Sequence, residues 1–344
     1  MLNGNGHKKF TSCGDVEAEM LLEKVLAEMR ETLSGTELCV VLGGSYGRGD
    51  GGVRQDKENG ILYNDLDFFV FARRKSVQSE KLLKEIARKY EDELKVDVDF
   101  SRIMTVTDIR NNAKRLMMQE LKRGYHLVCG EDLLAEYLPE HPAEKLPFSE
   151  ASRLLFNRGM GLMMAGEKIK NHSSNTDFIL RNIYKAILGC GDAMLISEGR
   201  YQWRLQERLN LIENSDLPDS WKTFYREAVD FKRFPHRKQK DDMVLFWNSV
   251  REFFRAEILR CAGTVDSKDL LNSLYLRSRK DGEVTWKNLM KYCLKTRSFP
   301  LVDRKKYMIP AVSGILPELY SGLEEIPEKL EQKSKLFQHW LIFN

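Results

Sequence analysis

The sequence has no apolar run of the roughly 20 residues that a membrane-spanning helix requires, and its first ten residues lack the apolar stretch of a secretory signal. Proline is scarce and glycine is not enriched, with 9 and 23 in 344 residues, which excludes collagenous and low-complexity chains. The net charge of only +4 gives no compositional sign of nucleic-acid binding. These absences predict a globular, cytoplasmic protein with no membrane partner.

The sequence also lacks closely spaced cysteines. The six cysteines lie far apart, with no Cys-x-x-Cys pair and no histidine at zinc-ligand spacing, so we interpret them as reduced thiols. What the chain does have is length and apolar content: 344 residues, 42% of them hydrophobic, are about twice a typical domain. We therefore expect two domains, each with its own core.

The N-terminal part alternates between helical and strand patterns. Amphipathic periodicity predicts helices at 15–33 and 77–90, and runs of β-branched and aromatic residues predict strands at 37–42, 61–71 and 94–103. This order predicts an α+β fold, a small mixed sheet with helices, over residues 1–140.

The C-terminal part reads as almost entirely helical. Helical periodicity predicts helices at 151–169, 177–197, 221–231, 243–259 and 267–279. Three prolines cluster in the segment 138–148, which is the best candidate for a linker. We expect an α-helical domain over residues 149–344 that closes over a cleft.

The most informative segment runs from Val40 to Phe71. A strand ends in Gly-Gly-Ser, a glycine-rich loop follows, and the next strand presents Asp65 and Asp67 two residues apart. Side chains two apart in a strand share a face, so the two carboxylates project together. Glycines let backbone N–H groups approach a phosphate, and paired carboxylates bind Mg²⁺ against the same phosphate. The segment thus predicts a metal and phosphate site.

In Gly44-Ser45, followed by Asp65-x-Asp67 and a later acidic strand, the chain resembles the DNA polymerase β-like nucleotidyltransferase superfamily, and distantly its uridylyltransferase and aminoglycoside-nucleotidyltransferase branches. The resemblance covers about residues 37–105. It implies a polymerase β-like fold and transfer of an NMP from an NTP such as ATP to an acceptor hydroxyl, with release of pyrophosphate. The acceptor is open: a small molecule, a protein side chain or an RNA end.

The resemblance also implies roles for individual residues. Asp65 and Asp67 would hold Mg²⁺, with Mn²⁺ as a substitute, and a third carboxylate would complete a two-metal site. Asp97 and Asp99 share a strand face, and we favour Asp97 because hydrophobic residues flank it as in the superfamily's third strand, with Asp99 as the alternative. The chain departs from the superfamily in a longer gap after Ser45, which we interpret as a surface hairpin at 50–60.

Three basic side chains are candidates for contacting phosphate. Gly44 and Ser45 would bind it through the loop, and Arg48 is placed to clamp it. In the helix predicted at 177–197, Lys185 lies on a polar stripe, and related enzymes often use a lysine from their helical domain for the NTP phosphates. The alternative is a buried ion pair between Lys185 and Asp192. Arg158 is a weaker candidate.

Other readings of the chain receive less support. The run from Gly47 to Gly52 matches G-x-G-x-x-G, but the loop does not open into the long helix that a dinucleotide site requires. A catalytically silent nucleotide-binding regulatory module remains an alternative to an enzyme. An RNA-binding adaptor that uses the basic segment 232–240 is another.

Overall fold

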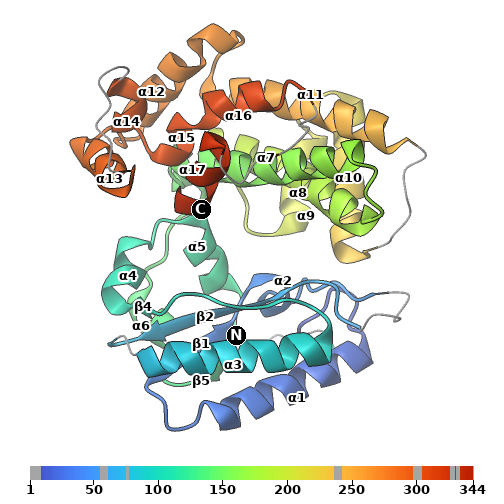
Figure 1. Cartoon of the computed structure of the whole chain (residues 1–344), viewed down its shortest axis with the longest axis vertical. Coiled ribbons are helices and arrows are strands. Elements are labelled where there is room, and N and C mark those ends of the chain that lie inside the picture. The colour runs from blue at the N-terminus through green and yellow to red at the C-terminus, as the bar shows by residue number, and fades with distance from the viewer. Residues whose placement is uncertain are drawn as a thin grey trace. The chain divides into compact units, whose positions relative to one another are not determined.

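The computed structural model describes residues 9–54, 61–74, 77–235, 242–296, 304–325, 330 and 334–343. The chain divides into two compact units (Figure 1). The sheet unit comprises residues 1–141 together with 230–236, and the helical unit comprises residues 142–229 and 237–344.

The sheet unit has the predicted mixture of helices and short strands. Its elements are α1 (Val16–Thr32), β1 (Leu38–Leu42), α2 (Gly44–Gly47), β2 (Leu66–Ala72), α3 (Val77–Leu94), β3 (Val98–Phe100), β4 (Met104–Thr105), α4 (Val106–Asn111), α5 (Leu116–Arg123), β5 (His126–Cys129) and α6 (Leu133–Tyr137). The helix starts follow local capping rules: Asp15 accepts a hydrogen bond from the Ala18 amide, and Thr105 and Asp108 form a capping box at α4.

The described strands form one small mixed sheet in the order β3-β2-β1-β5, with β4 also paired to β2. β1 runs antiparallel to β2 and β5, whereas β2 runs parallel to β3 and β4. The expectation of a small mixed sheet with helices, followed by a largely helical region, is confirmed.

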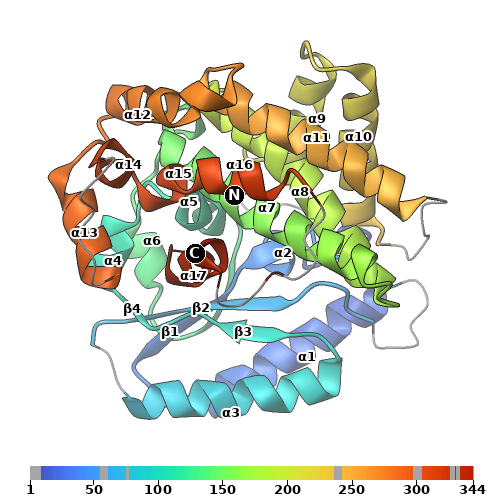
Figure 2. The same ribbon diagram turned by 45° about the horizontal axis from the view of Figure 1, so that its top comes forward.

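Helices cover both faces of this sheet. Figure 2 shows α1 and α3 together on one side. Alternate strand residues on that face share a hydrophobic core with these helices: Leu38, Val40, Leu42, Leu66, Phe68 and Val70. The opposite face, with Val41 and Phe71, packs against α4, α5 and α6 through Ile109, Met118 and Leu121 among others. Burial on both faces explains why β1 is apolar at every position.

Two predicted strands are longer than the strands observed. The prediction of a strand at 94–103 is wrong at both ends, because Leu94 ends α3 and Lys95 takes a left-handed turn with φ of 56°. Only Val98–Phe100 and Met104–Thr105 then pair with β2. β2 itself begins at Leu66 rather than Ile61, because residues 61–63 pair with residues 52–54 of the preceding loop instead of with the sheet; the Tyr63 amide, for example, donates to the Gly52 carbonyl at 3.2 Å.

The predicted hairpin at 50–60 is described at its two ends only. Val53 and Leu62 form an antiparallel bridge, and the Arg54 amide donates to the Ile61 carbonyl at 2.8 Å. Residues 55–60 lie outside the described part of the chain. The arms of the insertion therefore pair before β2 begins.

The helical unit is built around two long adjacent helices, α7 (Phe148–Lys170) and α8 (Thr176–Ser197). The other elements are η1 (Ala143–Lys145), α9 (Leu205–Glu213), α10 (Asp219–Arg233), α11 (Met243–Ala262), η2 (Ser267–Asp269), α12 (Leu270–Lys280), α13 (Trp286–Thr296), α14 (Arg304–Met308), α15 (Ala311–Gly314), α16 (Leu316–Gly322) and α17 (Lys335–Phe343). Among the described residues, none of these helices combines the length and the apolarity needed to cross a bilayer.

A buried tryptophan of α11 packs against α7. Trp247 is fully buried, its indole Nε1 donates to the Leu162 carbonyl at 2.7 Å, and its ring lies against Gly166, where a Cβ would come within 2.5 Å of it. A buried indole N–H needs such an acceptor. This contact fixes the position of α11 against the middle of α7.

Candidate functional site

The site begins where β1 ends, at Gly43, Gly44 and Ser45. The Gly43 amide donates to the Asp67 carbonyl at 2.8 Å, and the chain then turns into the short helix α2. Gly44 has φ of +60°, and a Cβ at this position would lie 2.0 Å from Oδ2 of Asp67. Glycine is therefore required both by the left-handed backbone and by the carboxylate packed against it.

Asp67 is the second residue of β2, and Asp65 lies one residue before this strand, close enough for its charge to raise the pKa of Asp99. β3 runs parallel beside β2 in a register that pairs Asp67 with Asp99. Paired residues of neighbouring strands point to the same side of a sheet, so Asp99 lies next to Asp67 on the carboxylate face.

Asp97 lies one residue before β3, where its carbonyl accepts the Leu66 amide at 2.9 Å. It therefore borders the same end of β2 but is not the register partner of Asp67. Among the two aspartates that the sequence left open, the strand pairing brings Asp99 directly beside the Asp-x-Asp pair.

The electrostatics of Asp99 reflect this crowding. Burial raises the pKa of the Asp99 carboxyl, and the negative charges of Asp65 and Asp97 raise it further. Acidic groups gathered in this way repel one another unless a cation lies between them. The donor chemistry of the cluster therefore suits a divalent metal ion.

A three-ligand metal cluster of His, Cys, Asp or Glu is not found among the described residues. Magnesium does not require one, because it keeps several waters and is commonly held by one or two carboxylates together with substrate phosphates. The adjacent carboxylates of Asp67 and Asp99, with the Asp65 charge near Asp99, supply hard oxygen ligands of the kind Mg²⁺ takes. The residues present fit the predicted ion.

Tyr46, which sequence reasoning did not single out, ties the glycine loop to the start of β2. Its side chain is fully buried, and its hydroxyl accepts the amides of Tyr63 and Asn64 at 3.0 and 3.2 Å while donating to the Gly52 carbonyl at 2.8 Å. The Asn64 side chain in turn accepts the Gly52 amide at 2.7 Å. These bonds fix the residue before Asp65. The sequence could have pointed to these residues only by their position, since Tyr46 follows Ser45 and Asn64 precedes Asp65.

Arg48 lies at the end of α2 with a partner of its own. Its guanidinium is 3.7 Å from the Glu120 carboxylate of α5, and both side chains are about one quarter exposed (24%). Its stem packs against Gly124. Arg48 is thus held at the loop by an ion pair. The sequence had suggested either a phosphate contact or a solvated side chain and did not predict this partner.

The predicted site residues are divided between the units. Gly44, Ser45, Arg48 and the four aspartates belong to the sheet unit, and Lys185 belongs to the helical unit on α8. The structure gives Asp192, the alternative partner of Lys185, an ion pair with Arg208 at 2.9 Å and a hydrogen bond from Tyr225 at 3.3 Å.

Comparison of this chain with models of known protein families, with curated proteins and with solved structures finds no match.

Proposed function

We propose that this chain is a metal-dependent nucleotidyltransferase of the DNA polymerase β-like superfamily, which transfers an NMP from an NTP to an acceptor hydroxyl. The supporting observation is the β2–β3 register, which pairs Asp67 with Asp99 beside the Gly44 turn. A sheet edge with adjacent carboxylates and a glycine turn against one of them is the arrangement that such chemistry needs.

In this reaction the acceptor hydroxyl gives up its proton to the third carboxylate, its oxygen forms a bond to the α-phosphorus, the bond from that phosphorus to the bridging oxygen of the β-phosphate breaks, and pyrophosphate leaves. Bound Mg²⁺ neutralises phosphate charge and makes the acceptor hydroxyl easier to deprotonate. Asp65 and Asp67 hold the ion, and Asp99 completes the carboxylate set in preference to Asp97. Ser45 and the amides of the glycine turn contact phosphate oxygens.

The test uses two labels on the same NTP. The purified full-length protein is incubated with Mg²⁺ and each of the four NTPs, labelled at the α- or the γ-phosphate, and with fractions of small molecules, protein and RNA. Transfer of an NMP carries the α-label to the acceptor and releases the γ-label as pyrophosphate. Transfer of the γ-label instead would identify a kinase and contradict the proposal.

Matched variants decide whether the label depends on the carboxylates. Asp67→Asn removes a ligand charge without changing volume, and we expect transfer to fall at least about a hundredfold. Asp92→Asn, at an exposed acid of α3, is the control and should keep full activity. NTP binding without any label transfer would favour the regulatory module, and salt-sensitive retention of RNA on filters would favour the adaptor.

A further inference from the structure

The helical unit has an exposed apolar stripe on α13. Its three side chains, Trp286, Met290 and Leu294, lie four residues apart and are 60%, 55% and 75% exposed. Residues four apart on a helix share one face, so the three side chains form a continuous row. Single exposed apolar residues are ordinary on a protein surface, whereas an aligned row of large ones is typical of an interaction surface.

The other side of α13 is packed against its own unit. Leu289 is buried, and the ring of Tyr292 lies 4.3 Å from that of Tyr307 in α14, measured between centroids (Figure 1). The Asn288 side chain donates to the Met308 carbonyl at 2.9 Å. These contacts fix the helix and leave the apolar stripe on its outer side.

Lysines border the apolar stripe. Lys287 and Lys291 each follow a stripe residue by one position, are exposed, and have no ion pair or hydrogen bond with any described residue. The segment 277–306 carries ten lysines and arginines against three acidic residues, a net charge of +7, although the whole chain carries only +4. The remainder of the chain is therefore net negative, and positive charge is concentrated in the segment that contains α13.

An apolar row beside a row of lysines fits the surface of an anionic bilayer. Helices that lie on a bilayer bury a row of Trp, Phe or Leu at the boundary between headgroups and acyl chains, while Lys and Arg contact anionic headgroups. Tryptophan is also the side chain that is enriched at this depth. The apolar stripe and its lysines have both properties.

Other occupants fit these observations less well. A second copy of the chain would bring two segments of charge +7 together, which electrostatic repulsion opposes. RNA offers bases for stacking, but only Trp286 of the three stripe residues is aromatic. A stable protein interface needs a much wider complementary area than three side chains. A bilayer requires no such shape complementarity.

An exposed apolar pair in the sheet unit provides a contrast. Val16 and Met20 of α1 are each 66% exposed and lie four residues apart, but their exposed neighbours on the helix are Glu17 and Glu23. Negative charges there oppose contact with an anionic surface. Exposure of apolar side chains is therefore common to both helices, and the charge beside them distinguishes α13.

We propose that α13 docks the protein onto membranes that contain anionic lipids, with its apolar stripe at the headgroup boundary and Lys287 and Lys291 against the headgroups. Lying on a bilayer requires no spanning helix, so the proposal is compatible with the lack of one among the described residues. It differs from the sequence-based expectation of no membrane partner, which rested on the lack of a long apolar run. No carboxylate of the candidate site takes part, so this inference is separate from nucleotidyl transfer.

The test is flotation of the full-length protein with lipid vesicles, without Mg²⁺ or NTP. One set of vesicles is phosphatidylcholine alone, and the other contains about one third phosphatidylglycerol, which is anionic. We expect binding to the anionic set only, weakened at about 1 M salt because salt screens the charges. The lysine variant Lys287→Gln, Lys291→Gln should weaken this binding at least about tenfold. Its matched control, Lys24→Gln, Lys81→Gln, changes two exposed lysines of the sheet unit and should bind as the native protein does.

The apolar contact is tested separately. The stripe variant Trp286→Ser, Leu294→Ser should also weaken vesicle binding at least about tenfold, whereas Met20→Ser, at a similarly exposed residue of α1, should not. Trp286→Phe keeps an aromatic ring, so it should retain most of the binding but lose the blue shift of tryptophan fluorescence that vesicles produce. Circular dichroism checks that each variant is folded.

The proposal is overturned if the native protein does not bind anionic vesicles, or if the lysine variant or the stripe variant binds them as well as the native protein. Without vesicle binding, a dimer that the stripe variant abolishes would assign the surface to a second copy, and RNA retention that the lysine variant abolishes would assign it to RNA. Because no turnover is measured, a failure here is distinguishable from a failure of the nucleotidyl-transfer assay.

Discussion

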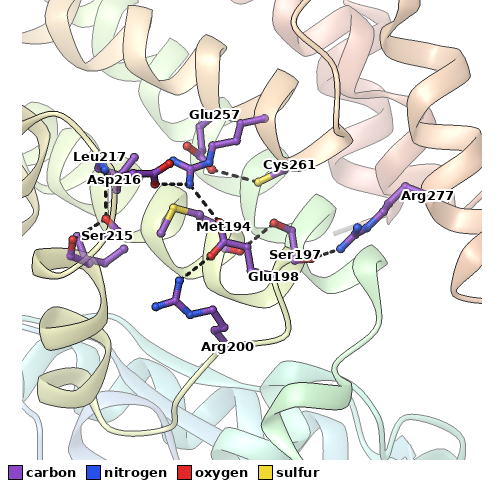
Figure 3. A network of polar contacts seen from close by, with 12 residues as sticks. Met194, Ser197, Glu198, Arg200, Ser215, Asp216, Leu217, Glu257, Cys261 and Arg277 are labelled. Atoms are coloured by element: carbon purple, nitrogen blue, oxygen red, sulfur yellow. Dashed lines mark hydrogen bonds and ion pairs between the residues drawn. The ribbon is translucent and has the colours of Figure 1, made fainter.

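Glu257 is a buried carboxyl whose ionisation should make the helical unit less stable at high pH. It lies on α11 with only 2% of its surface exposed, and Cys261 donates a hydrogen bond to it at 3.3 Å (Figure 3). Burial raises the pKa of the Glu257 carboxyl from 4.5 to about 7, against the lowering effect of the Arg260 charge and the Cys261 bond.

Charged neighbours of Glu257 also affect its pKa. Arg260 is shared with two other acids, Glu198 at 3.2 Å and Asp216 at 3.0 Å, and both of these negative charges raise the pKa of Glu257. The Cys261 thiol stays protonated because burial raises its pKa well above the ordinary value. The described groups around Glu257 thus leave it without a counter-ion of its own.

The direction and the size of this pH effect on the free energy of unfolding follow from proton linkage. The folded state binds the Glu257 proton more tightly than the unfolded state, so the stabilisation is complete below pH 4.5 and is lost as pH rises to about 7. A shift of this size corresponds to about 3 kcal/mol in the free energy of unfolding. Glu257→Gln removes the titrating group and should remove this loss.

The assay is urea unfolding of both proteins at about pH 5 and about pH 8, followed by tryptophan fluorescence. The buried amide of the variant adds a constant cost, so the informative quantity is the difference between the two pH values. We expect Glu257→Gln to gain about 2.5 kcal/mol relative to the native protein between them, because part of the full effect is already lost at pH 5. Glu252→Gln, at an acid of the same helix that is 57% exposed, should gain almost nothing. An equal pH dependence in the native protein and Glu257→Gln would refute the reasoning.

Three further predictions concern the carboxylate site. If the strand register selects the third carboxylate, Asp99→Asn should lower NMP transfer by orders of magnitude and Asp97→Asn much less, and the opposite ranking in steady-state assays would return the role to Asp97. Gly44→Ala should lower the free energy of unfolding by about 1–2 kcal/mol through backbone strain alone, and it should displace the carboxylate of Asp67. An unchanged melting temperature and unchanged turnover would argue against the close contact. Tyr46→Phe removes three hydrogen bonds and should cost about 1–3 kcal/mol in thermal unfolding, whereas a neutral change would show that the loop holds without them.

The sequence by itself determined the features that depend on near neighbours. A short run of apolar residues located β1, and helical periodicity located the long helices α7 and α8, each to within a few residues, because these patterns follow directly from which faces of an element are buried. The ends of strands did not follow from these patterns, since residues 61–63 pair with residues 52–54 of the insertion rather than with the neighbouring strands of the sheet.

The tertiary structure decided what depends on partners distant in sequence. The register of two strands separated by α3 set Asp99 beside Asp67, although both aspartates of that strand fit the motif. Residues 230–236 lie among helices in sequence yet belong to the sheet unit, where Phe231 meets the Tyr63 ring with 6.0 Å between centroids. Such pairings are chosen by packing and hydrogen bonding across the whole unit, and no local pattern in the chain encodes which distant residue becomes the neighbour.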